Sequence, residues 1–212
     1  MMINDDIIAK IYDPFLYLAL KSIRIAVMNE LLKYKDKTIL DLCCGTGNQL
    51  KLLSKHGFKN LHCLDISNSM LEIARKHCYH INIYNEDATK TSFITGSIDI
   101  AIISFALHEK DRTDQVSILN EAHRLIKEDG FILVVDYNVS DKIPGPVKTV
   151  INIIERIAGK EHYHNFKSYL RNSGLSSLIN KDRFKLVNYK RKLFNAVAIG
   201  IIKKCPYKKK VL

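Results

Sequence analysis

The stretch from Thr38 to Asn48 constrains the fold of this chain more than any other. It begins with an apolar run of strand length, Ile39 to Leu42, and continues into a loop with two glycines. Gly45 and Gly47 permit positive φ angles and a close approach of the backbone to a ligand. Helical spacing follows from residue 49. A strand, a glycine loop and a helix start predict a ligand-binding crevice, because unpaired amides of the helix start point into it.

The chemistry of this loop excludes two common ligands. A nicotinamide-binding loop needs a third glycine, and Leu50 stands at that position. A phosphate loop of the ATPase kind needs a Lys-Ser or Lys-Thr pair after the glycines, which the sequence lacks. Asp41 lies at the mouth of the loop, where its carboxylate would repel a pyrophosphate and attract an ammonium or sulfonium group. The loop therefore favours a cationic ligand.

Acidic residues also follow the next two predicted strands. Leu61–Asp65 ends in an acid, and the short strand 81–84 is followed by Asp87. Asp65 lies where a Rossmann-like fold presents a carboxylate to a ribose diol, whose hydroxyls donate to the two oxygens. Because the carboxyl ends of parallel strands meet at one edge of a sheet, Asp41, Asp65 and Asp87 are expected to line one crevice.

Three segments resemble motifs of the class I S-adenosylmethionine-dependent methyltransferases. Residues 41–47 match the first motif, acidic-x-Gly-x-Gly-x-Gly, with Cys43 in place of the first glycine. Residues 65–71 resemble the second motif. Residues 125–131 resemble the family's Leu-Lys-Pro-Gly-Gly signature, although Glu128-Asp129 replaces Pro-Gly. The resemblance covers Thr38 to Tyr137 and implies S-adenosylmethionine as the cofactor, with S-adenosylhomocysteine as the product.

The resemblance also implies which residues contact the cofactor. In the family the glycine loop cradles the methionine half, and the residues matching Ile66 and Met70 flank the adenine, although packing in the core would also explain both. Asp87 and Ala88 match the positions that bind the adenine ring. The implied cofactor residues are Asp41, Cys43, Gly45, Thr46, Gly47, Asp65, Ile66, Met70, Asp87, Ala88 and Ser104.

Three residues are candidates for the catalytic side of the site. His108 follows the predicted strand 97–104 and is expected near the transferred methyl group, as a general base or as part of the pocket wall. By resemblance, Tyr12 belongs to an element that caps the cleft, although a helix cap with packed aromatics remains an alternative. His162 lies in an insertion that covers the substrate in related enzymes. His162 and His164 are two residues apart and could bind a metal ion, but no cluster of acids or cysteines lies nearby in the sequence. No metal site is therefore expected.

The pattern as a whole predicts one α/β domain with a Rossmann-like, seven-stranded, mostly parallel sheet, helices on both faces and a terminal antiparallel hairpin. Residues 7–34 are expected to be helical, with one apolar face. The expected parts are an N-terminal helical cap (1–36), a cofactor-binding core (38–137), a substrate-side helical insertion (144–180), terminal strands (183–202) and a basic tail (203–212).

The net charge of +11 resides almost entirely in the C-terminal segment. From Lys181 onward there are eleven Lys or Arg and one acid. This segment would contact RNA or an anionic membrane, or it forms a solvated strand edge whose lysines prevent association. No run of apolar residues suits a membrane span or a secretory signal. The five cysteines form no Cys-x-x-Cys pair and are expected to be reduced in a cytoplasmic protein.

The expected activity is methyl transfer by direct displacement from S-adenosylmethionine to a small acceptor, apolar or lipid-like. The sequence lacks the Asn-Pro-Pro-aromatic tetrapeptide of amino-methylating nucleic-acid enzymes and the Pro-Cys pair of cytosine C5 enzymes. Two alternatives stay open: an RNA methyltransferase that uses the basic C-terminal segment, and a non-catalytic partner subunit that binds S-adenosylmethionine. The sequence predicts neither the acceptor atom nor the oligomeric state.

Overall fold

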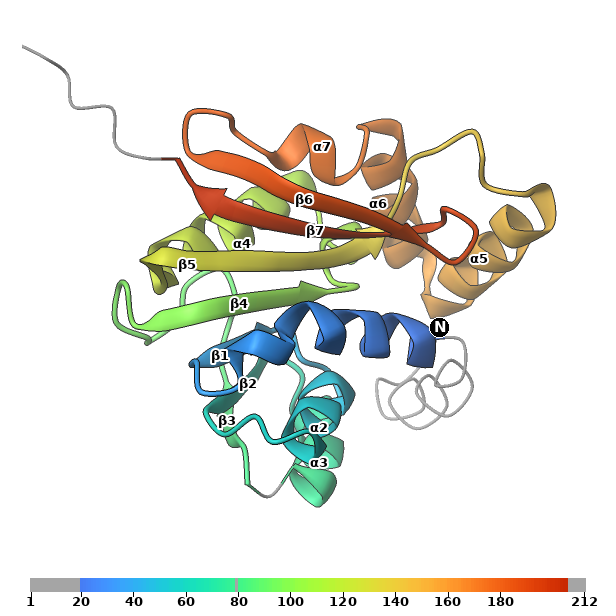
Figure 1. The fold of residues 1–212 in the computed structure, drawn as a ribbon. Helices are drawn as coiled ribbons and strands as arrows, with labels where there is room; N and C mark the ends of the chain where they lie inside the picture. The colour runs from blue at the N-terminus through green and yellow to red at the C-terminus, as the bar shows by residue number, and fades with distance from the viewer. Residues whose placement is uncertain (1–19, 79, 206–212) are drawn as a thin grey trace, which may run out of the picture.

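The computed structural model describes residues 20–78 and 80–205, and a single sheet runs through it (Figure 1). Its strand order is β3-β2-β1-β4-β5-β7-β6. The first five strands are parallel, and β7 runs antiparallel to both β5 and β6. The strands are β1 (Ile39–Leu42), β2 (Leu61–Asp65), β3 (Asn82–Asn85), β4 (Ile98–Ser104), β5 (Ile126–Tyr137), β6 (Phe184–Lys192) and β7 (Val197–Lys204). The predicted fold class is confirmed, including the terminal antiparallel hairpin.

Helices cover both faces of this sheet. Residues 20–31 form a helix, which a short 3-10 turn, η1 (Leu32–Tyr34), extends. The other helical elements are α2 (Asn48–Lys55), α3 (Asn68–His77), η2 (Leu107–Glu109), α4 (Arg112–Leu125), α5 (Gly145–Ala158), α6 (Lys160–Arg171) and α7 (Leu175–Leu178). The first helix, α2 and α3 pack on one face, and α4, α6 and α7 on the other. The helix predicted over 7–34 is confirmed from residue 20, and Tyr12 lies outside the described residues.

The central strands β1 and β4 are almost wholly apolar and are buried on both faces. In β1, Ile39 packs into the core beneath the first helix, and Leu40 packs into the core beneath α4. The same alternation continues through β4, where Ile102 and Ile103 face opposite cores. β1 pairs with β2 on one side and with β4 on the other. This arrangement brings the loops that follow the three strands to one edge of the sheet.

The start of β5 differs from the sequence expectation. The sequence predicts a turn at Asp129-Gly130 before a strand that begins at Phe131, whereas β5 begins at Ile126 and includes that turn. The pairing of β4 with β5 shifts register there, which accommodates the extra residues. A Cβ atom at Gly130 would lie 2.6 Å from the carbonyl oxygen of Asp99, so the close approach of the two strands requires glycine.

The expectation that all five cysteines are reduced is wrong for two of them. Cys44 and Cys63 form a disulfide, with their Cα atoms 5.6 Å apart. The pairing of β1 with β2 brings them together, because the N–H of Cys44 donates to the carbonyl of Leu64 at 2.9 Å. The thiols of Cys43, Cys78 and Cys205 are free.

Within the described ranges, no helix combines the length and the apolar character that a membrane crossing requires.

A substitution at Gly47 tests how tightly the glycine loop packs against α3. Its φ is 73°, and a Cβ atom there would lie 2.9 Å from Cys78 Sγ and 3.2 Å from Ala74 Cβ. Gly47→Ala is expected to lower the free energy of unfolding by the cost of a left-handed alanine, about 1–2 kcal/mol, plus about 1–3 kcal/mol of overpacking. Gly96→Ala is the matched control, since Gly96 has a φ of 67° and open space around it. Equal losses in urea titrations of the two variants would contradict the packing role.

Candidate active site

A cavity of about 470 Å³ opens at the carboxyl ends of β1, β2 and β4. Its wall combines the glycine loop, the start of α3, the loop after β3, the end of β4 and the first helix, with His162 of α6 at one side. All the predicted cofactor residues except Gly47 line it: Asp41, Cys43, Gly45, Thr46, Asp65, Ile66, Met70, Asp87, Ala88 and Ser104. Gly47 lies behind the loop, where it packs against α3.

The carboxylate of Asp65 joins two turns of the cavity wall. Its Oδ2 accepts the N–H of Gly45 at 2.8 Å, and its Oδ1 accepts the N–H of Ser67 at 2.9 Å. Ser67 then caps α3, because its hydroxyl accepts the N–H of Met70. Each carboxylate oxygen has a second lone pair, so Asp65 retains acceptor capacity for two hydroxyl donors. This is the chemistry that a ribose diol requires.

Asp41 has a buried oxygen without a partner. Its side chain is 1% exposed, and Oδ1 makes no hydrogen bond with any described residue. Burial, and then the negative charge of Asp65, raise the pKa of Asp41 from 3.8 to about 8. An unpaired acceptor in a cavity wall is costly unless a ligand supplies a donor. A ligand with an ammonium group would satisfy this oxygen and favour its ionised form.

The remaining cofactor residues form the adenine side of the predicted site. Ile66 is 64% exposed, although it is a large apolar side chain, and it lines the cavity together with Met70. Asp87 begins a tight turn, in which its Oδ1 accepts the N–H of Thr89 at 2.8 Å, and the buried Ala88 follows. An exposed apolar side chain beside a cavity is a surface that a flat ring can cover.

The loop also explains the family's preference for glycine at the position of Cys43. The φ of Cys43 is 68°, in the left-handed region that costs a residue with a side chain about 1–2 kcal/mol. Phe105, which follows β4 and lines the same cavity, has a φ of 52°. Strained backbone at two positions of one wall is typical of a functional site.

These residues fit S-adenosylmethionine. Asp41 offers an unpaired carboxylate oxygen to the amino group, Asp65 retains acceptor capacity for the ribose, and Ile66 offers an uncovered apolar surface to the adenine.

The predicted catalytic residues His108 and His162 lie on the other side of the cavity, His162 in its wall and His108 behind the wall. His162 lines the cavity, as do Glu109 and the apolar residues Phe105 and Ala158. His108 does not line it and is 1% exposed, so the expectation that it lies beside the transferred methyl group does not match its position.

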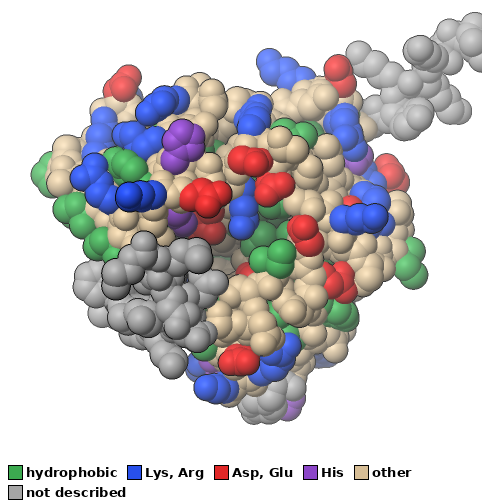
Figure 2. Space-filling model, turned by 180° about the vertical axis from the view of Figure 1, so that it is seen from behind, with side chains coloured by type: hydrophobic (Ala, Val, Ile, Leu, Met, Phe, Trp, Pro, Cys, Tyr) green, Lys and Arg blue, Asp and Glu red, His purple; other side chains and the backbone are tan. Residues whose placement is uncertain are grey.

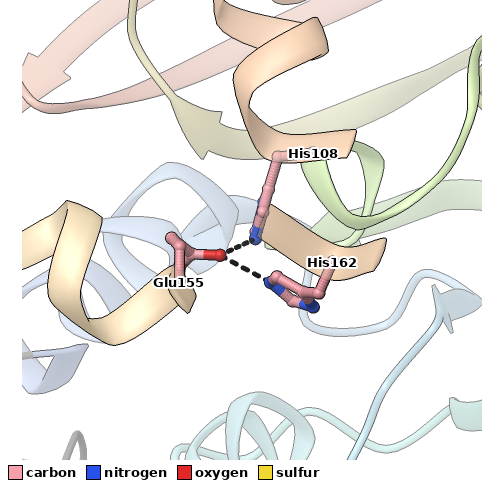
Figure 3. Close-up of side chains that lie close together, drawn as sticks. All are labelled: His108, Glu155 and His162. Carbon is pink, nitrogen blue, oxygen red and sulfur yellow. Dashed lines mark hydrogen bonds and ion pairs between the residues drawn. The ribbon is translucent and has the colours of Figure 1, made fainter. Parts of the chain in front are cut away.

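Glu155 of α5 connects the two histidines (Figure 3). Its Oε2 lies 2.5 Å from Nε2 of His162 and 3.4 Å from Nε2 of His108. Its Oε1 accepts the hydroxyl of Tyr137 at 2.6 Å. Nδ1 of His108 lies 2.7 Å from Oδ1 of Asp136. We call His108, Glu155 and His162 the His-Glu-His cluster.

The charges of the cluster act on one another. Burial opposes a charge on His108, but the carboxylates of Asp136 and Glu155 outweigh burial and raise the pKa of this imidazole well above its ordinary value. Burial would raise the pKa of Glu155, but its bonds to the two histidines and Tyr137 lower it. Burial raises the pKa of Glu109.

Sequence reasoning missed Glu155 altogether. It is an acid inside a predicted helix of the insertion, and nothing in its local pattern distinguishes it from a solvated position. Its burial, with 2% exposure, follows only from the packing of α5 on α6, which in turn packs on η2.

Comparisons with known proteins give the family. A family model described as a methyltransferase domain matches residues 39–130. The chain is 28% identical over 190 residues to the demethylmenaquinone methyltransferase of Leptospira interrogans, covering 78% of this chain and 74% of that protein. These comparisons support a class I S-adenosylmethionine-dependent methyltransferase. The methyltransferase is also 26% identical over 122 residues to the ubiquinone/menaquinone biosynthesis C-methyltransferase of Campylobacter jejuni, spanning 55% of this chain and 51% of that protein.

Solved structures share the fold of this methyltransferase. A protein from Pyrococcus horikoshii superposes with a TM-score of 0.61 at 20% identity, covering 87% of this chain and 91% of that one. A SAM-dependent methyltransferase from Aquifex aeolicus superposes with a TM-score of 0.53 at 16% identity, covering 82% and 88%.

Asp65→Ala tests the ribose assignment. Loss of hydrogen bonds to a charged acceptor is expected to weaken the binding of S-adenosylmethionine by about 10–100-fold, as measured by isothermal titration. Asp36→Ala is the control, since the Asp36 side chain is 89% exposed. NAD is expected not to bind either protein. An Asp65→Ala variant that melts normally and binds the cofactor with unchanged affinity would remove the assignment.

Asp41→Asn tests the unpaired carboxyl. Between about pH 4 and pH 8 the folded state retains the proton on Asp41 and the unfolded state loses it, so this group's contribution to stability falls as the pH rises. Asparagine does not titrate. Without cofactor, the melting temperature of Asp41→Asn relative to that of the wild-type protein is therefore expected to rise from pH 5 to pH 8. The expected rise is about 2–4 °C for each kcal/mol of stability that the wild-type protein loses over this range. A difference independent of pH would contradict the raised pKa.

Proposed function

We propose that this methyltransferase acts on a small, largely apolar acceptor with a quinone-like ring, bound between Phe105 and His162. The observation that carries the proposal is the match to the Leptospira relative, which is named as a demethylmenaquinone methyltransferase and aligns with 78% of the chain. Beyond the cofactor residues, the cavity wall includes the apolar side chains of Phe105, Ala106, Ile118 and Ala158 and the polar side chains of Glu109, Lys110, Asp114 and His162. Apolar side chains with polar groups among them suit a flat ring with oxygen substituents.

The chain contributes mainly position to this reaction. Bound S-adenosylmethionine supplies the methyl group, which leaves its sulfonium by direct displacement. Asp65, Asp87 and Ile66 would fix the cofactor's ribose and adenine, and Asp41 would fix its amino group. The acceptor's nucleophilic atom must then lie about 3–3.5 Å from the methyl carbon, and alignment of this kind supplies a large part of the rate. The first helix contributes Leu20, Ile23 and Arg24 to the cavity wall, and these side chains would exclude water from the bound cofactor.

The assignment of roles to the histidines follows their depth. His162 lines the cavity, so it would contact the acceptor. His108 lies behind it and acts through Glu155, which makes it a positioning residue. Tyr12, expected as a lid residue, lies outside the described part of the chain.

The location of the basic residues disfavours the RNA alternative. Lys185, Lys190, Arg191 and Lys192 lie on β6, the edge strand three places from β4. None of the described residues from 181 onward lines the cavity. Figure 2 shows acidic side chains in the middle of one face and a group of lysines and arginines at its upper left. These features support the solvated strand edge over a phosphate-binding surface. A peripheral contact of β6 with an anionic membrane is compatible with a lipid-like acceptor.

Methyl transfer from labelled S-adenosylmethionine tests the proposal. The assay compares a soluble, chemically reduced naphthoquinone that lacks one ring methyl group with bulk RNA. Label is expected in the quinol and not in the RNA. Turnover on RNA alone, or on neither acceptor by a protein that binds the cofactor, would contradict the proposal; the second outcome would support a non-catalytic partner subunit.

Ala158→Phe tests the location of the acceptor. Ala158 lines the cavity beside His162, so the added ring is expected to lower kcat/KM for the quinol at least ~10-fold and to leave cofactor affinity unchanged. Ile157→Phe is the matched control, because Ile157 is adjacent and 65% exposed. Equal activity of the two variants would place the acceptor elsewhere.

A further inference from the structure

We propose that His108, Glu155 and His162 bind one divalent transition-metal ion beside the acceptor end of the cavity. The cluster brings together three segments that are far apart in the sequence: η2, α5 and α6. One ligand atom of each residue lies within 4.8 Å of those of the other two, and Oε2 of Glu155 is close to Nε2 of both histidines. Figure 3 shows the Glu155 carboxylate directed at both rings. Two imidazoles and one carboxylate form a donor set that divalent transition metals prefer.

A second layer of hydrogen bonds prepares these ligands. Nδ1 of His108 lies 2.7 Å from Oδ1 of Asp136, and this contact directs the other ring nitrogen at Glu155. Asp136 is itself fixed by the backbone N–H groups of Leu107 and Tyr137. A carboxylate behind a ligating histidine is the usual outer layer of a metal site.

The two oxygens of Glu155 have separate partners. Oε1 accepts the hydroxyl of Tyr137 at 2.6 Å, and this bond leaves Oε2 between the two histidines. The distance of 3.4 Å from Oε2 to Nε2 of His108 suits two ligands of one ion at about 2.1 Å each in tetrahedral geometry. Oε2 lies 2.5 Å from Nε2 of His162, so His162 would move outward by about 1 Å as the ion replaces the proton between them. His162 is on the cavity side and 19% exposed, so its helix has room for this adjustment.

The charge of the cluster also suits a cation. Asp136 and Glu155 are 2% exposed, and without a metal ion their buried negative charges are paired with the imidazoles of His108 and His162. A divalent ion can replace the protons on these rings, because one such ion with two neutral imidazoles and two carboxylates has no net charge. Imidazole ligands favour Zn²⁺, Fe²⁺, Co²⁺ or Mn²⁺ over Mg²⁺ and Ca²⁺, which prefer all-oxygen sites.

The position of the cluster indicates what the ion would do. Three protein ligands leave a coordination position open, as in catalytic rather than structural sites. That position is reached from the cavity past His162, where an oxygen of the acceptor could bind and lose its proton more readily. This role rests on the proposed function, whereas metal binding itself does not.

Zinc titration of the full-length, tag-free protein tests the site. The protein is first stripped with a chelator, and Zn²⁺ binding is then followed by competition with a chromophoric indicator. One tightly bound Zn²⁺ per chain is expected, with at least ~100-fold weaker binding in Glu155→Gln and in His162→Ala. Millimolar Mg²⁺ is expected not to compete. Co²⁺ substitution is expected to give the visible absorption of a four- or five-coordinate site, and this absorption is lost in both variants.

His164→Ala is the matched control, since His164 lies on the same helix, is exposed and is not part of the cluster. Its zinc affinity is expected to be unchanged. Tyr137→Phe removes the bond that orients Glu155 and is expected to weaken zinc binding about 10-fold without removing a ligand. Melting curves without metal establish that each variant folds.

Three outcomes would overturn the site: no stoichiometric Zn²⁺ binding by the wild-type protein, unchanged binding in both Glu155→Gln and His162→Ala, or equal displacement by Mg²⁺. Titration with S-adenosylmethionine on the same stripped samples separates this failure from failure of the proposed function. Cofactor binding and quinol methylation without zinc binding would remove only the metal site. Zinc binding without any quinol methylation would remove only the acceptor assignment.

Discussion

The hydrogen bonds from the amides of Gly45 and Ser67 to the carboxylate of Asp65 are the contacts on which the cofactor cavity depends. They join the loop after β1 to the turn that starts α3, and they do so at the point where the two parallel strands end side by side. Once these turns are fixed, the oxygen of Asp41 is enclosed in the wall and Ile66 is held at its rim. Gly47 completes the arrangement because only glycine lets α2 approach α3 at that distance.

Several features of the cavity lower the stability of the folded state when no ligand is bound. Burial and then the charge of Asp65 raise the pKa of Asp41, and Cys43 and Phe105 have left-handed backbone angles. Each feature destabilises the chain without a ligand and becomes useful when a cationic cofactor binds. Buried charge is also concentrated in the His-Glu-His cluster, where the carboxylates of Asp136 and Glu155 lie on either side of the His108 ring.

Much of the fold, and the gathering of the predicted cofactor residues in one cavity wall, could be predicted from the sequence because the signals are local. The run 39–47 specifies a buried strand and a glycine loop, and Asp65 stands at a fixed spacing after it. The His-Glu-His cluster could not be predicted, since Glu155 reaches His108 only through the packing of α5 on α6 and of α6 on η2. The Cys44–Cys63 disulfide likewise depends on strand pairing, and the early start of β5 depends on its register with β4.

The most direct measurement is a crystal structure of the protein with S-adenosylhomocysteine. The account predicts the amino group within hydrogen-bond distance of Asp41, both ribose hydroxyls on Asp65, and the adenine between Ile66 and Asp87. The thioether sulfur should then point toward the side of the cavity lined by His162. A ligand bound away from Asp41 and Asp65, or in the reverse orientation, would contradict the account at its centre.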